Sequence, residues 1–581
     1  MAKRIVIVGG VAAGASAAAK ARRMNEDVEI VMLEAGSYIS FANCGLPYYV
    51  GGEIADRDKL FVVKADVFAR RFNVDIRTET TVTSVDRAER VVTVRRSDGK
   101  YEKLTYDRLL LATGAESLRP PIRGLDRDNI FMVRSVPDVD AISDFLHQAT
   151  PPGQAAAESI QRVPLRTVVI GGGYIGLETA EQLLRLEVGV TVVEMADQLM
   201  LAMDPEMAQP LQAALETAGA EVILSDAVAE IADEGGRSVV VTQSGRRIPF
   251  DLGILAVGVR PNVELAAASG VELGDTGAIK VDALQRTSDP AIYAAGDNSE
   301  TQHIVLGRPV NIPLAGAANK AGRAAGANMA LDLIGAADND LLRLTLKGVL
   351  GTAVVRVGKV VAACTGLNER AARRAGMDYE VIYLPGPNHA SYYPGAEMMV
   401  LKILFARDTS RLLGAQAVGG EGVDKRIDVI ATAIVGGLTI EDLEQLDLCY
   451  APPFGSAKDV AILAGFAGTD VRRGLMPTIT PAKLLEELVG QSPPVVLDVR
   501  SSKEFTEGHL DGALHIPVDE LRDRLEEVPR DQPVAAHCEG GYRSYLAQRI
   551  LTAKGWRNVR NVTGGFMMIR RQQALRRAGR A

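Results

Sequence analysis

Two cysteines stand in sequence contexts that favour chemistry. Cys44 lies in the run SFANCGLPYY, where Gly45 and Pro47 oppose the interior of a helix and place the thiol where an element begins or ends. Cys538 follows an apolar run and opens the glycine-rich loop CEGGYRS. A thiol in such a loop is either a buried apolar residue or a nucleophile that handles sulfur.

Cys44 has no cysteine partner nearby in the sequence. Cys364 and Cys449 lie far along the chain in apolar surroundings, and we expect both to be core residues. Chemistry on a disulfide needs two sulfurs, so the partner of Cys44 is a bound thiol or the substrate, unless Cys44 cycles through a sulfenic acid. Four cysteines without a C-x-x-C pair fit a reducing cytoplasm, and no cluster of histidines, cysteines and carboxylates indicates a metal.

A glycine-rich turn near the start of the chain predicts a source of electrons. A β-branched strand leads into Gly9-Gly10-Val11-Ala12-Ala13-Gly14, an alanine-rich helix follows, and the next strand ends at Glu34. This order is the dinucleotide fingerprint, in which the helix N-terminus binds pyrophosphate and the acidic residue binds ribose hydroxyls. Val11 departs from the pattern because it replaces the second glycine. The alternative is a glycine-rich turn without a ligand.

A second fingerprint follows the strand that begins at residue 167. It reads Gly171-Gly172-Gly173-Tyr174-Ile175-Gly176, and the next strand ends at Glu194. Two fingerprints predict two dinucleotides, and the usual pair is a flavin with a nicotinamide. The Glu194 carboxylate would repel a 2′-phosphate, so the sequence favours NADH over NADPH. Glu178, one turn into the helix, either faces the nicotinamide or is solvated.

Three further segments resemble the flavoprotein disulfide reductase superfamily. They are YDRLLLATGAESLRPP at 106–121, LGILAVGVRPN at 252–262, and TSDPAIYAAGD at 287–297, whose terminal Asp bonds the ribityl chain of FAD in that superfamily. The FAD contacts that this resemblance implies are Gly9, Gly10, Ala13, Gly14, Glu34, Ala35, Val82, Ala112, Thr113, Gly114, Asp297, Pro313, Leu314 and Ala315. The implied NADH contacts are Gly171, Gly173, Tyr174, Ile175, Gly176, Glu178, Glu194 and Gly258.

The run SFANCGLPYY and the later run HASYYPGA at 389–396 together resemble the coenzyme A-disulfide reductase family. The coenzyme A contacts that this resemblance implies are Ser16, Lys20, Arg23, Ser40, Asn43, Arg71 and Asn319. By spacing alone, the first three share one face of the first helix, and such a face can also be simply solvated.

The same resemblance gives roles to aromatic residues. It implies that Tyr392 or Tyr393 donates a proton or a hydrogen bond near the Cys44 sulfur from the other subunit; the alternative for either is packing at a domain edge. Phe454 stands where some members of the family have a tyrosine. The missing hydroxyl weakens the case for coenzyme A disulfide as the substrate and fits a smaller sulfane-sulfur substrate.

The end of the chain resembles a single rhodanese domain. The resemblance is carried by PVVLDVR at 494–500, EGHLDGALHIP at 507–517 and CEGGYRS at 538–544, and Cys538 matches the sulfur-carrying cysteine. Backbone N–H groups of its loop, the following helix N-terminus and Arg543 can hold a persulfide anion. With this domain appended, the chain resembles the fused subgroup of the coenzyme A-disulfide reductase family, the NADH-dependent persulfide and polysulfide reductases.

An α/β fold of several domains must position these residues. We expect two Rossmann-like domains, an α+β dimerisation domain and an α/β rhodanese domain. The expected bounds are 1–115 and 255–335 for FAD, 116–254 for NADH, 336–466 for dimerisation, 467–476 for a linker and 477–581 for the rhodanese domain. Strands at 398–405 and 411–418 should form a hairpin. In the superfamily, the dimerisation domain makes a homodimer and completes the partner's active site.

Length and charge exclude several classes of protein. The chain has 581 residues, of which 47% are hydrophobic, and its net charge of −8 argues against general nucleic-acid binding. The longest apolar stretch without charge, 429–440, is too short to span a bilayer. We therefore expect a cytoplasmic protein with neither nucleic acid nor membrane as a partner.

The sequence predicts an oxidoreductase that acts on sulfur. In this interpretation a homodimeric FAD enzyme uses NADH to reduce persulfides, polysulfides or coenzyme A persulfide through Cys44 and bound coenzyme A, while Cys538 handles sulfane sulfur. The alternatives are a coenzyme A-disulfide reductase, an NADH oxidase or peroxidase with a Cys44 sulfenic acid, and a sulfur sensor with a vestigial flavin. The sequence leaves open the physiological substrate, which of Tyr392 and Tyr393 faces the site, and how sulfur travels from Cys538 to Cys44.

Overall fold

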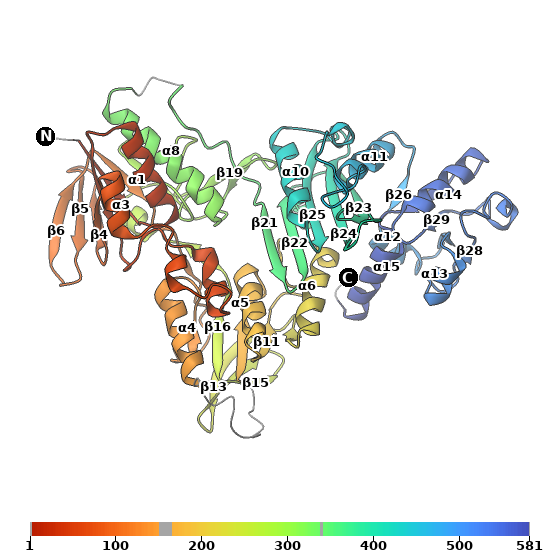
Figure 1. Cartoon of the computed structure of the whole chain (residues 1–581), viewed down its shortest axis with the longest axis horizontal. Helices are drawn as coiled ribbons and strands as arrows, with labels where there is room; N and C mark the ends of the chain where they lie inside the picture. Colours follow the sequence, from red (N-terminus) through yellow and green to blue (C-terminus); the bar gives the residue numbers. More distant parts are fainter. Residues whose placement is uncertain (1–2, 150–164, 337–340, 580–581) are drawn as a thin grey trace. The chain divides into compact units, whose positions relative to one another are not determined.

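The computed structural model describes residues 3–149, 165–336 and 341–579, which form two compact units (Figure 1). Met1–Met195 and Gly219–Gly351 make the first unit, and Ala196–Ala218 and Thr352–Ala581 make the second. Both units mix helices with sheets, which confirms the predicted α/β fold class. Residues 196–218, which the sequence placed in the NADH domain, group with the second unit. None of the helices in the described ranges is long and apolar enough to cross a membrane.

Two five-stranded parallel sheets of the same design form the centre of the first unit. Their strand orders are β18-β7-β1-β2-β3 and β12-β11-β10-β16-β9. The strands of the first sheet are β18 Ile292–Ala294, β7 Arg108–Leu111, β1 Arg4–Val8, β2 Glu29–Leu33 and β3 Asp75–Arg77. Those of the second are β12 Glu221–Ile223, β11 Gly189–Val193, β10 Arg166–Ile170, β16 Leu252–Leu255 and β9 Ile130–Phe131. β1, β2 and β10 are almost wholly apolar, as strands buried on both faces must be.

Each glycine fingerprint connects a central strand of one sheet to a helix. β1 leads into α1 (Ala12–Met24), and β10 leads into α5 (Tyr174–Arg185). A Cβ on Gly14 would lie 1.8 Å from the Gly9 carbonyl oxygen, and one on Gly176 would lie 2.0 Å from that of Gly171. Only glycine therefore allows each helix to approach its strand, which explains the spacing seen in the sequence.

The long helix α8 (Ala315–Leu333) lies along α1 (Figure 1). Cβ atoms on Gly322 and Gly326 would lie 2.1 and 2.2 Å from the carbonyl oxygens of Ala13 and Ala17. Small residues on both helices thus allow close contact between their backbones.

The remaining elements of the first unit surround these sheets. Two three-stranded antiparallel sheets are β4 Thr81–Asp86, β5 Val91–Arg95, β6 Tyr101–Thr105, and β13 Val228–Glu234, β14 Arg237–Thr242, β15 Arg247–Phe250. Two-stranded pairs are β8 Ala115–Ser117 with β17 Val259–Pro261, and β19 Thr301–His303 with β20 Arg308–Val310. Further helices are α2 Leu46–Val50, η2 Arg57–Leu60, α3 Ala65–Phe72, α4 Val136–Ala149 and α7 Glu264–Ala268.

The second unit contains a five-stranded antiparallel sheet. Its order is β21 Ala353–Val357, β22 Val360–Gly366, β25 Leu412–Gly419, β24 Met398–Ala406 and β23 Tyr379–Pro387. β24 and β25 pair as the predicted hairpin. α10 (Val423–Val435) and α11 (Val460–Arg472) pack on this sheet, as Figure 1 shows. Because α11 continues to Arg472, residues 467–472 of the expected linker are helical, and the connection to the next sheet is 473–477.

A parallel sheet ends the second unit. Its order is β26 Thr478–Ile479, β30 Val559–Val562, β29 Val534–His537, β27 Val495–Asp498 and β28 Leu514–His515. Its helices are α12 Pro481–Glu487, α13 Ser502–Glu507, α14 Tyr542–Ala553 and α15 Gly565–Arg577. Cys538 directly follows the central strand β29, at the edge where parallel sheets bind ligands. α14 begins at Tyr542, so Arg543 lies in the first helical turn and not in the loop that the sequence predicted.

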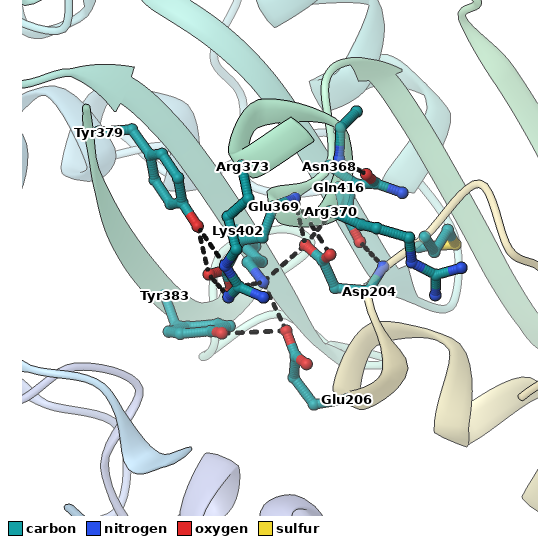
Figure 2. A network of polar contacts seen from close by, with 12 residues as sticks. Asp204, Glu206, Asn368, Glu369, Arg370, Arg373, Tyr379, Tyr383, Lys402 and Gln416 are labelled. Atoms are coloured by element: carbon teal, nitrogen blue, oxygen red, sulfur yellow. Dashed lines mark hydrogen bonds and ion pairs between the residues drawn. The ribbon is translucent and has the colours of Figure 1, made fainter. Parts of the chain in front are cut away.

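A buried ion network attaches α6 (Pro205–Thr217) to the antiparallel sheet (Figure 2). Lys402 of β24 is fully buried, and its Nζ lies 2.7 Å from Asp204, 2.6 Å from Glu206 and 2.7 Å from Glu369. Burial alone would lower the pKa of Lys402, but the surrounding charges, Glu206 first, raise it well above its ordinary value. The three carboxylates have the spacing of a metal site, but the Lys402 ammonium occupies its centre.

The same network contacts the C-terminal sheet. The Tyr383 hydroxyl donates to Glu206 Oε1 at 2.9 Å, and the Tyr383 N–H donates to Thr563 Oγ1 at 2.8 Å. Gln572 of α15 donates to Glu206 Oε2 at 3.4 Å. A Cβ on Gly564 would lie 2.8 Å from Tyr383 Cβ, so the two sheets are closely packed here. The C-terminal α/β part is therefore docked on the antiparallel sheet.

Candidate active site

Cys44 lies in a short 3-10 turn, η1 (Asn43–Gly45), directly before α2. The thiol thus stands at the beginning of an element, as predicted. Ser40 has φ +48°, a left-handed conformation that a residue with a side chain rarely adopts, and its N–H donates to the Gly10 carbonyl at 3.0 Å. This bond holds the Cys44 turn directly against the first glycine fingerprint.

The surroundings of Cys44 oppose its ionisation. The thiol is exposed, yet the protein around it removes part of its hydration, and this effect, with the negative charges of Glu178 and Asp297, raises its pKa. Arg134 acts in the opposite direction. Arg134 Nη2 lies 3.6 Å from Asp297 Oδ2, and burial raises the pKa of Asp297. Cys44 is therefore a thiol whose charge is controlled by neighbours of both signs.

The helix after Cys44 packs on the helix of the second fingerprint. The Tyr48 hydroxyl on α2 donates to Glu178 Oε1 on α5 at 3.0 Å. A Cβ on Gly51 would lie 2.0 Å from Gln182 Oε1, so the end of α2 also touches α5. Glu178 is half-buried, and burial raises its pKa. Of the two alternatives for Glu178, the structure contradicts a simply solvated side chain.

Both fingerprints fit a dinucleotide. The first turns of α1 and α5 contain no acidic residue, so their N–H groups can approach an anion. The strand-end carboxylates Glu34 and Glu194 accept from the N–H groups of Gly10 at 2.7 Å and Gly172 at 2.6 Å. Apart from Gly173 and its neighbours in the chain, the described residues place no atom within 4 Å of a Cβ built on Gly173, which leaves room for a pyrophosphate.

Some of the other expected FAD residues lie close together at the ends of β7 and β18 in the first sheet. A Cβ on Gly296, next to Asp297, would lie 3.0 Å from Ala13 Cβ. The side chain of Asn298 donates to Thr113 Oγ1 at 3.0 Å, so the ends of β18 and β7 are joined. Ala112 and Gly114 flank Thr113 after β7, Pro313 and Leu314 precede α8, Ala315 opens α8, Ala35 follows Glu34, and Val82 lies in β4. Gly258, which was expected to contact NADH, precedes β17.

A positively charged face lies where α1 and α8 meet. Ser16 Oγ donates to Asn319 Oδ1 at 2.8 Å. Partial burial and the positive charges of Arg323 and Arg23 lower the pKa of Lys20. Such an accumulation of cations fits a phosphate better than a face that is only solvated. Arg323 was missed by the sequence interpretation, although it lies four residues after Asn319 and so on the same face of α8.

Two further expected coenzyme A residues lie outside this face. Arg71 is exposed on α3, which packs against α1. Asn43 donates from Nδ2 to the Arg134 carbonyl at 3.5 Å, and its buried Oδ1 accepts no hydrogen bond from the described residues. The amide beside Cys44 thus has an acceptor that remains available.

Exposed tyrosines gather on the second unit. The hydroxyls of Tyr392 and Tyr450 lie 3.1 Å apart, and these side chains are 75% and 50% exposed. Tyr393 packs edge-on against the ring of His389. Phe454, in the same segment as Tyr450, is 71% exposed. The hydroxyl pair therefore contains Tyr392 rather than Tyr393, and its second member, Tyr450, was missed although it lies only four residues before Phe454.

Cys538 is nearly inaccessible at the end of β29. Its Sγ accepts from the Gly541 N–H at 3.0 Å and from Ser544 Oγ at 3.5 Å. Arg543 forms two hydrogen bonds to Glu504, at 2.6 and 2.7 Å. Donors converge on this sulfur, so the loop is suited to hold a sulfur anion.

The two remaining cysteines differ from each other. Cys364 is buried in β22, as expected. Cys449 is exposed, so the expectation that it is a core residue is wrong. It lies in an irregular segment between η3 (Asp442–Gln445) and α11, where an apolar sequence borders the exposed tyrosines instead of a core.

A family model for pyridine nucleotide-disulphide oxidoreductases matches residues 3–322, more than half of the chain. The chain belongs to the pyridine nucleotide-disulphide oxidoreductase family. The model of this family's dimerisation domain matches residues 352–461, and a rhodanese-like domain model matches residues 480–572.

Known oxidoreductases of this family are similar over most of the chain. Coenzyme A disulfide reductase of Staphylococcus haemolyticus is 33% identical, covering 81% of this chain and 100% of that protein. The structure of reduced Bacillus anthracis CoADR-RHD is 40% identical and covers 99% of both chains, with a TM-score of 0.92. The structure of a NAD-dependent persulfide reductase from A. fulgidus is 38% identical, covering 97% of this chain and 99% of that one, with a TM-score of 0.87. Membership of the oxidoreductase family implies FAD and NAD(P)H.

Proposed function

We propose that this oxidoreductase is a homodimeric, NADH-dependent reductase of persulfides, polysulfides or coenzyme A persulfide, with coenzyme A bound beside Cys44. One observation carries the proposal: Cys44 lies between two dinucleotide fingerprints, and the three other cysteines belong to the second unit. Because the first unit contains no second cysteine, we infer that the partner sulfur of Cys44 belongs to a bound thiol. The cationic face of Lys20, Arg23 and Arg323 supports coenzyme A, which carries three phosphates.

The two parallel sheets support a division of the first unit. An FAD domain at 1–115 and 255–335 and an NADH domain at 116–254, apart from residues 196–218 of the second unit, each contain one sheet and one fingerprint. The Glu194 carboxylate at the second fingerprint favours NADH over NADPH. Four free cysteines agree with a reducing cytoplasm.

The side chains around Cys44 suit sulfur transfer. When bound, FAD and NADH would supply the two electrons that Cys44 needs to leave a disulfide with the coenzyme A thiol as a free thiolate. The Cys44 thiolate then attacks the sulfane sulfur of R–S–SH, the S–S bond breaks, and RSH leaves with a proton. The Cys44 persulfide would lose sulfide when a bound thiol such as that of coenzyme A attacks the Cys44 sulfur, which would restore the disulfide. Arg134 stabilises the thiolate, and the hydroxyl pair of the partner subunit is a source of protons.

The C-terminal part would supply sulfur to this site. Cys538 takes a sulfane sulfur from a donor, and the converging donors around its Sγ hold the persulfide anion. Because this part is docked through Tyr383 and Gln572, we propose that coenzyme A moves between the two cysteines, rather than the domain.

An anaerobic titration tests the function. NADH should bleach the flavin, and polysulfide or coenzyme A persulfide should then restore its colour and release sulfide. Cys44→Ser should abolish this turnover, whereas Cys538→Ser should still reduce polysulfide. Cys449→Ser removes another exposed cysteine and is the matched control. Wild-type NADH consumption by Cys44→Ser with polysulfide contradicts the proposal. Intact mass without a coenzyme A adduct on Cys44 would favour an NADH oxidase or peroxidase.

A further inference from the structure

The charges around Cys538 are balanced in pairs. Three arginines lie at the sulfur loop, and each is bound to a carboxylate. Arg543 forms its double hydrogen bond with Glu504. Arg500 lies 2.7 Å from Asp498 and 3.5 Å from Glu539, and Arg570 lies 2.6 Å from Glu539. Three positive and three negative side chains therefore leave no net charge around the thiolate from these groups.

The pairing of Arg543 is tight. Its hydrogen bonds lower the pKa of Glu504 to about 2, so this carboxylate is ionised throughout the physiological range. Glu504 is also the third helical residue of α13, where it forms a capping box with Ser501. The carboxylate is thus fixed by the fold, and Arg543, which also faces the Cys538 sulfur, shares its charge with Glu504 and cannot move further towards a substrate without losing a charge-assisted pair.

The neighbouring histidine adds no positive charge. His537 precedes Cys538 and is fully buried, and burial lowers its pKa to about 4. It stacks on Phe566, whose ring also lies 3.9 Å from the Arg500 guanidinium. At neutral pH this histidine is uncharged, so an anionic substrate gains nothing from it.

Sulfur donors differ in charge. Thiosulfate is a dianion at neutral pH, whereas an organic persulfide carries at most one charge on its sulfur chain. Beside the loop, Pro385 lies 3.6 Å from a Cβ built on Gly540, and Tyr542 is 72% exposed in the first turn of α14. These apolar surfaces can contact an organic group, which thiosulfate lacks.

We propose that Glu504 and Glu539, by neutralising Arg543, Arg500 and Arg570, make the Cys538 loop selective for organic persulfides over thiosulfate. The proposal rests on the role of Cys538 as the sulfur carrier and names its donor class. In the reaction, the Cys538 thiolate attacks the terminal sulfur of R–S–S⁻, the S–S bond breaks, RS⁻ leaves, and Cys538 becomes a persulfide. No net electrons are gained or lost.

Sulfur transfer to cyanide, measured as thiocyanate, tests the selectivity in the holoenzyme. The donors are thiosulfate and the persulfide of N-acetylcysteamine, whose organic part is uncharged. We expect the wild type to prefer the persulfide in kcat/KM by about tenfold, since thiosulfate carries one more negative charge towards the Cys538 thiolate and one such charge costs about tenfold. Glu504→Gln keeps the capping box but frees Arg543, so thiosulfate kcat/KM should rise about tenfold while that of the persulfide changes little.

Matched variants decide the outcome. Glu507→Gln removes the same charge from the same helix, but Glu507 faces only Lys503, 3.9 Å away, so its selectivity should equal that of the wild type. Glu539→Gln is the second test and should also favour thiosulfate. The proposal is overturned if the wild type prefers thiosulfate, or if the Glu504 and Glu539 variants behave as Glu507→Gln does. The assay uses neither NADH nor Cys44, so its result is independent of the reductase reaction.

Discussion

At the scale of single residues, Cys44 is poised between opposite charges. Glu178 and Asp297 raise its pKa, and Arg134 lowers it. The Glu178 carboxylate is itself held in place by Tyr48, on the helix that follows Cys44. The helix that carries the second fingerprint therefore influences the charge of the thiol in the first. Removal of either charge should shift the pH at which Cys44 reacts.

We expect Glu178→Gln to lower the pKa of Cys44, because the neutral amide no longer repels the thiolate. Arg134→Met should raise it, because the stabilising cation is lost. The measurement is the rate of Cys44 alkylation by iodoacetamide against pH, in holoenzyme reduced and freed of small thiols. Glu187→Gln, at the exposed end of α5, is the control and should leave the profile unchanged. Identical profiles for the Glu178 and Glu187 variants would refute the electrostatic assignment.

Residues in continuous motifs were predictable, and those that act across the fold were not. The glycines and strand-end acids of both fingerprints follow from local spacing, because one strand and one helix suffice to set their roles. Arg323 and Tyr450 gain meaning only from partners more than 50 positions away, on α1 and beside Tyr392. Cys449 was misjudged for a related reason, since apolar neighbours in sequence do not establish a buried position.

At the scale of elements, α6 shows that ion pairs between residues distant in the sequence can determine where a helix packs. Its sequence follows the second fingerprint directly, so local order assigned it to the NADH domain. Asp204 and Glu206 instead surround the buried Lys402 of β24 (Figure 2). The sequence around Lys402 does not indicate which carboxylates pair with it, because these carboxylates lie at the start of α6 and in α9 (Glu369–Arg374). This ion network could not be derived from the sequence.

We expect Lys402→Met to lower the free energy of unfolding by roughly 3–5 kcal/mol, because the buried Asp204 and Glu206 and the half-buried Glu369 lose their counter-ion. Urea unfolding followed by the fluorescence of Trp556, the single tryptophan of the chain, reports on the second unit. Lys503→Met, at an exposed position, is the control and should change little.

The loss of unfolding free energy in Lys402→Met should depend on pH, and the direction in which the pKa of Glu369 shifts determines how. The ammonium contributes to lowering the pKa of Glu369, so its removal raises the pKa of this half-buried acid. An acid whose folded pKa is raised destabilises the protein above its unfolded pKa and ceases to do so as the pH falls and both states are protonated. The gap between wild type and variant should therefore narrow towards acidic pH. A constant gap would indicate lost packing and not unpaired charge.

At the scale of the whole molecule, the order of the domains could be predicted from the sequence, because each domain contains its own short sequence motif. Apolar strands followed by glycine-rich turns predict the two parallel sheets of the first unit. The loop around Cys538 predicts the C-terminal domain. The packing of the C-terminal α/β part against the antiparallel sheet could not be predicted from the sequence. It depends on Tyr383, Thr563 and Gln572, and none of the motifs in the sequence analysis contains these residues. The exposed Tyr392–Tyr450 pair is a candidate for a contact with the partner subunit, since large exposed aromatic side chains are typical of an interface.

A hybrid dimer tests whether the Tyr392–Tyr450 pair serves the Cys44 of the partner subunit. Cys44→Ser removes the nucleophile from one chain, and Tyr392→Phe with Tyr450→Phe removes both hydroxyls from the other. Co-expressed with two different tags and purified through both, the hybrid contains one site with an intact cysteine and intact tyrosines if the sites are shared. It should then show about half of the wild-type NADH-dependent activity, because one of two symmetric sites is complete.

Sites built within a single chain give a different result. Each site of the hybrid would then lack either its cysteine or its hydroxyls, and activity would not exceed the mean of the two parent variants. The parents purified alone provide that baseline, and size-exclusion chromatography of each checks that the substitutions leave the assembly intact. Tyr101→Phe, which is 66% exposed on β6 of the first unit, replaces the tyrosine variants in the control hybrid. That hybrid keeps one Cys44 and both hydroxyl pairs, so it should retain half activity under either arrangement, and only the loss of Tyr392 and Tyr450 distinguishes a shared site from a local one.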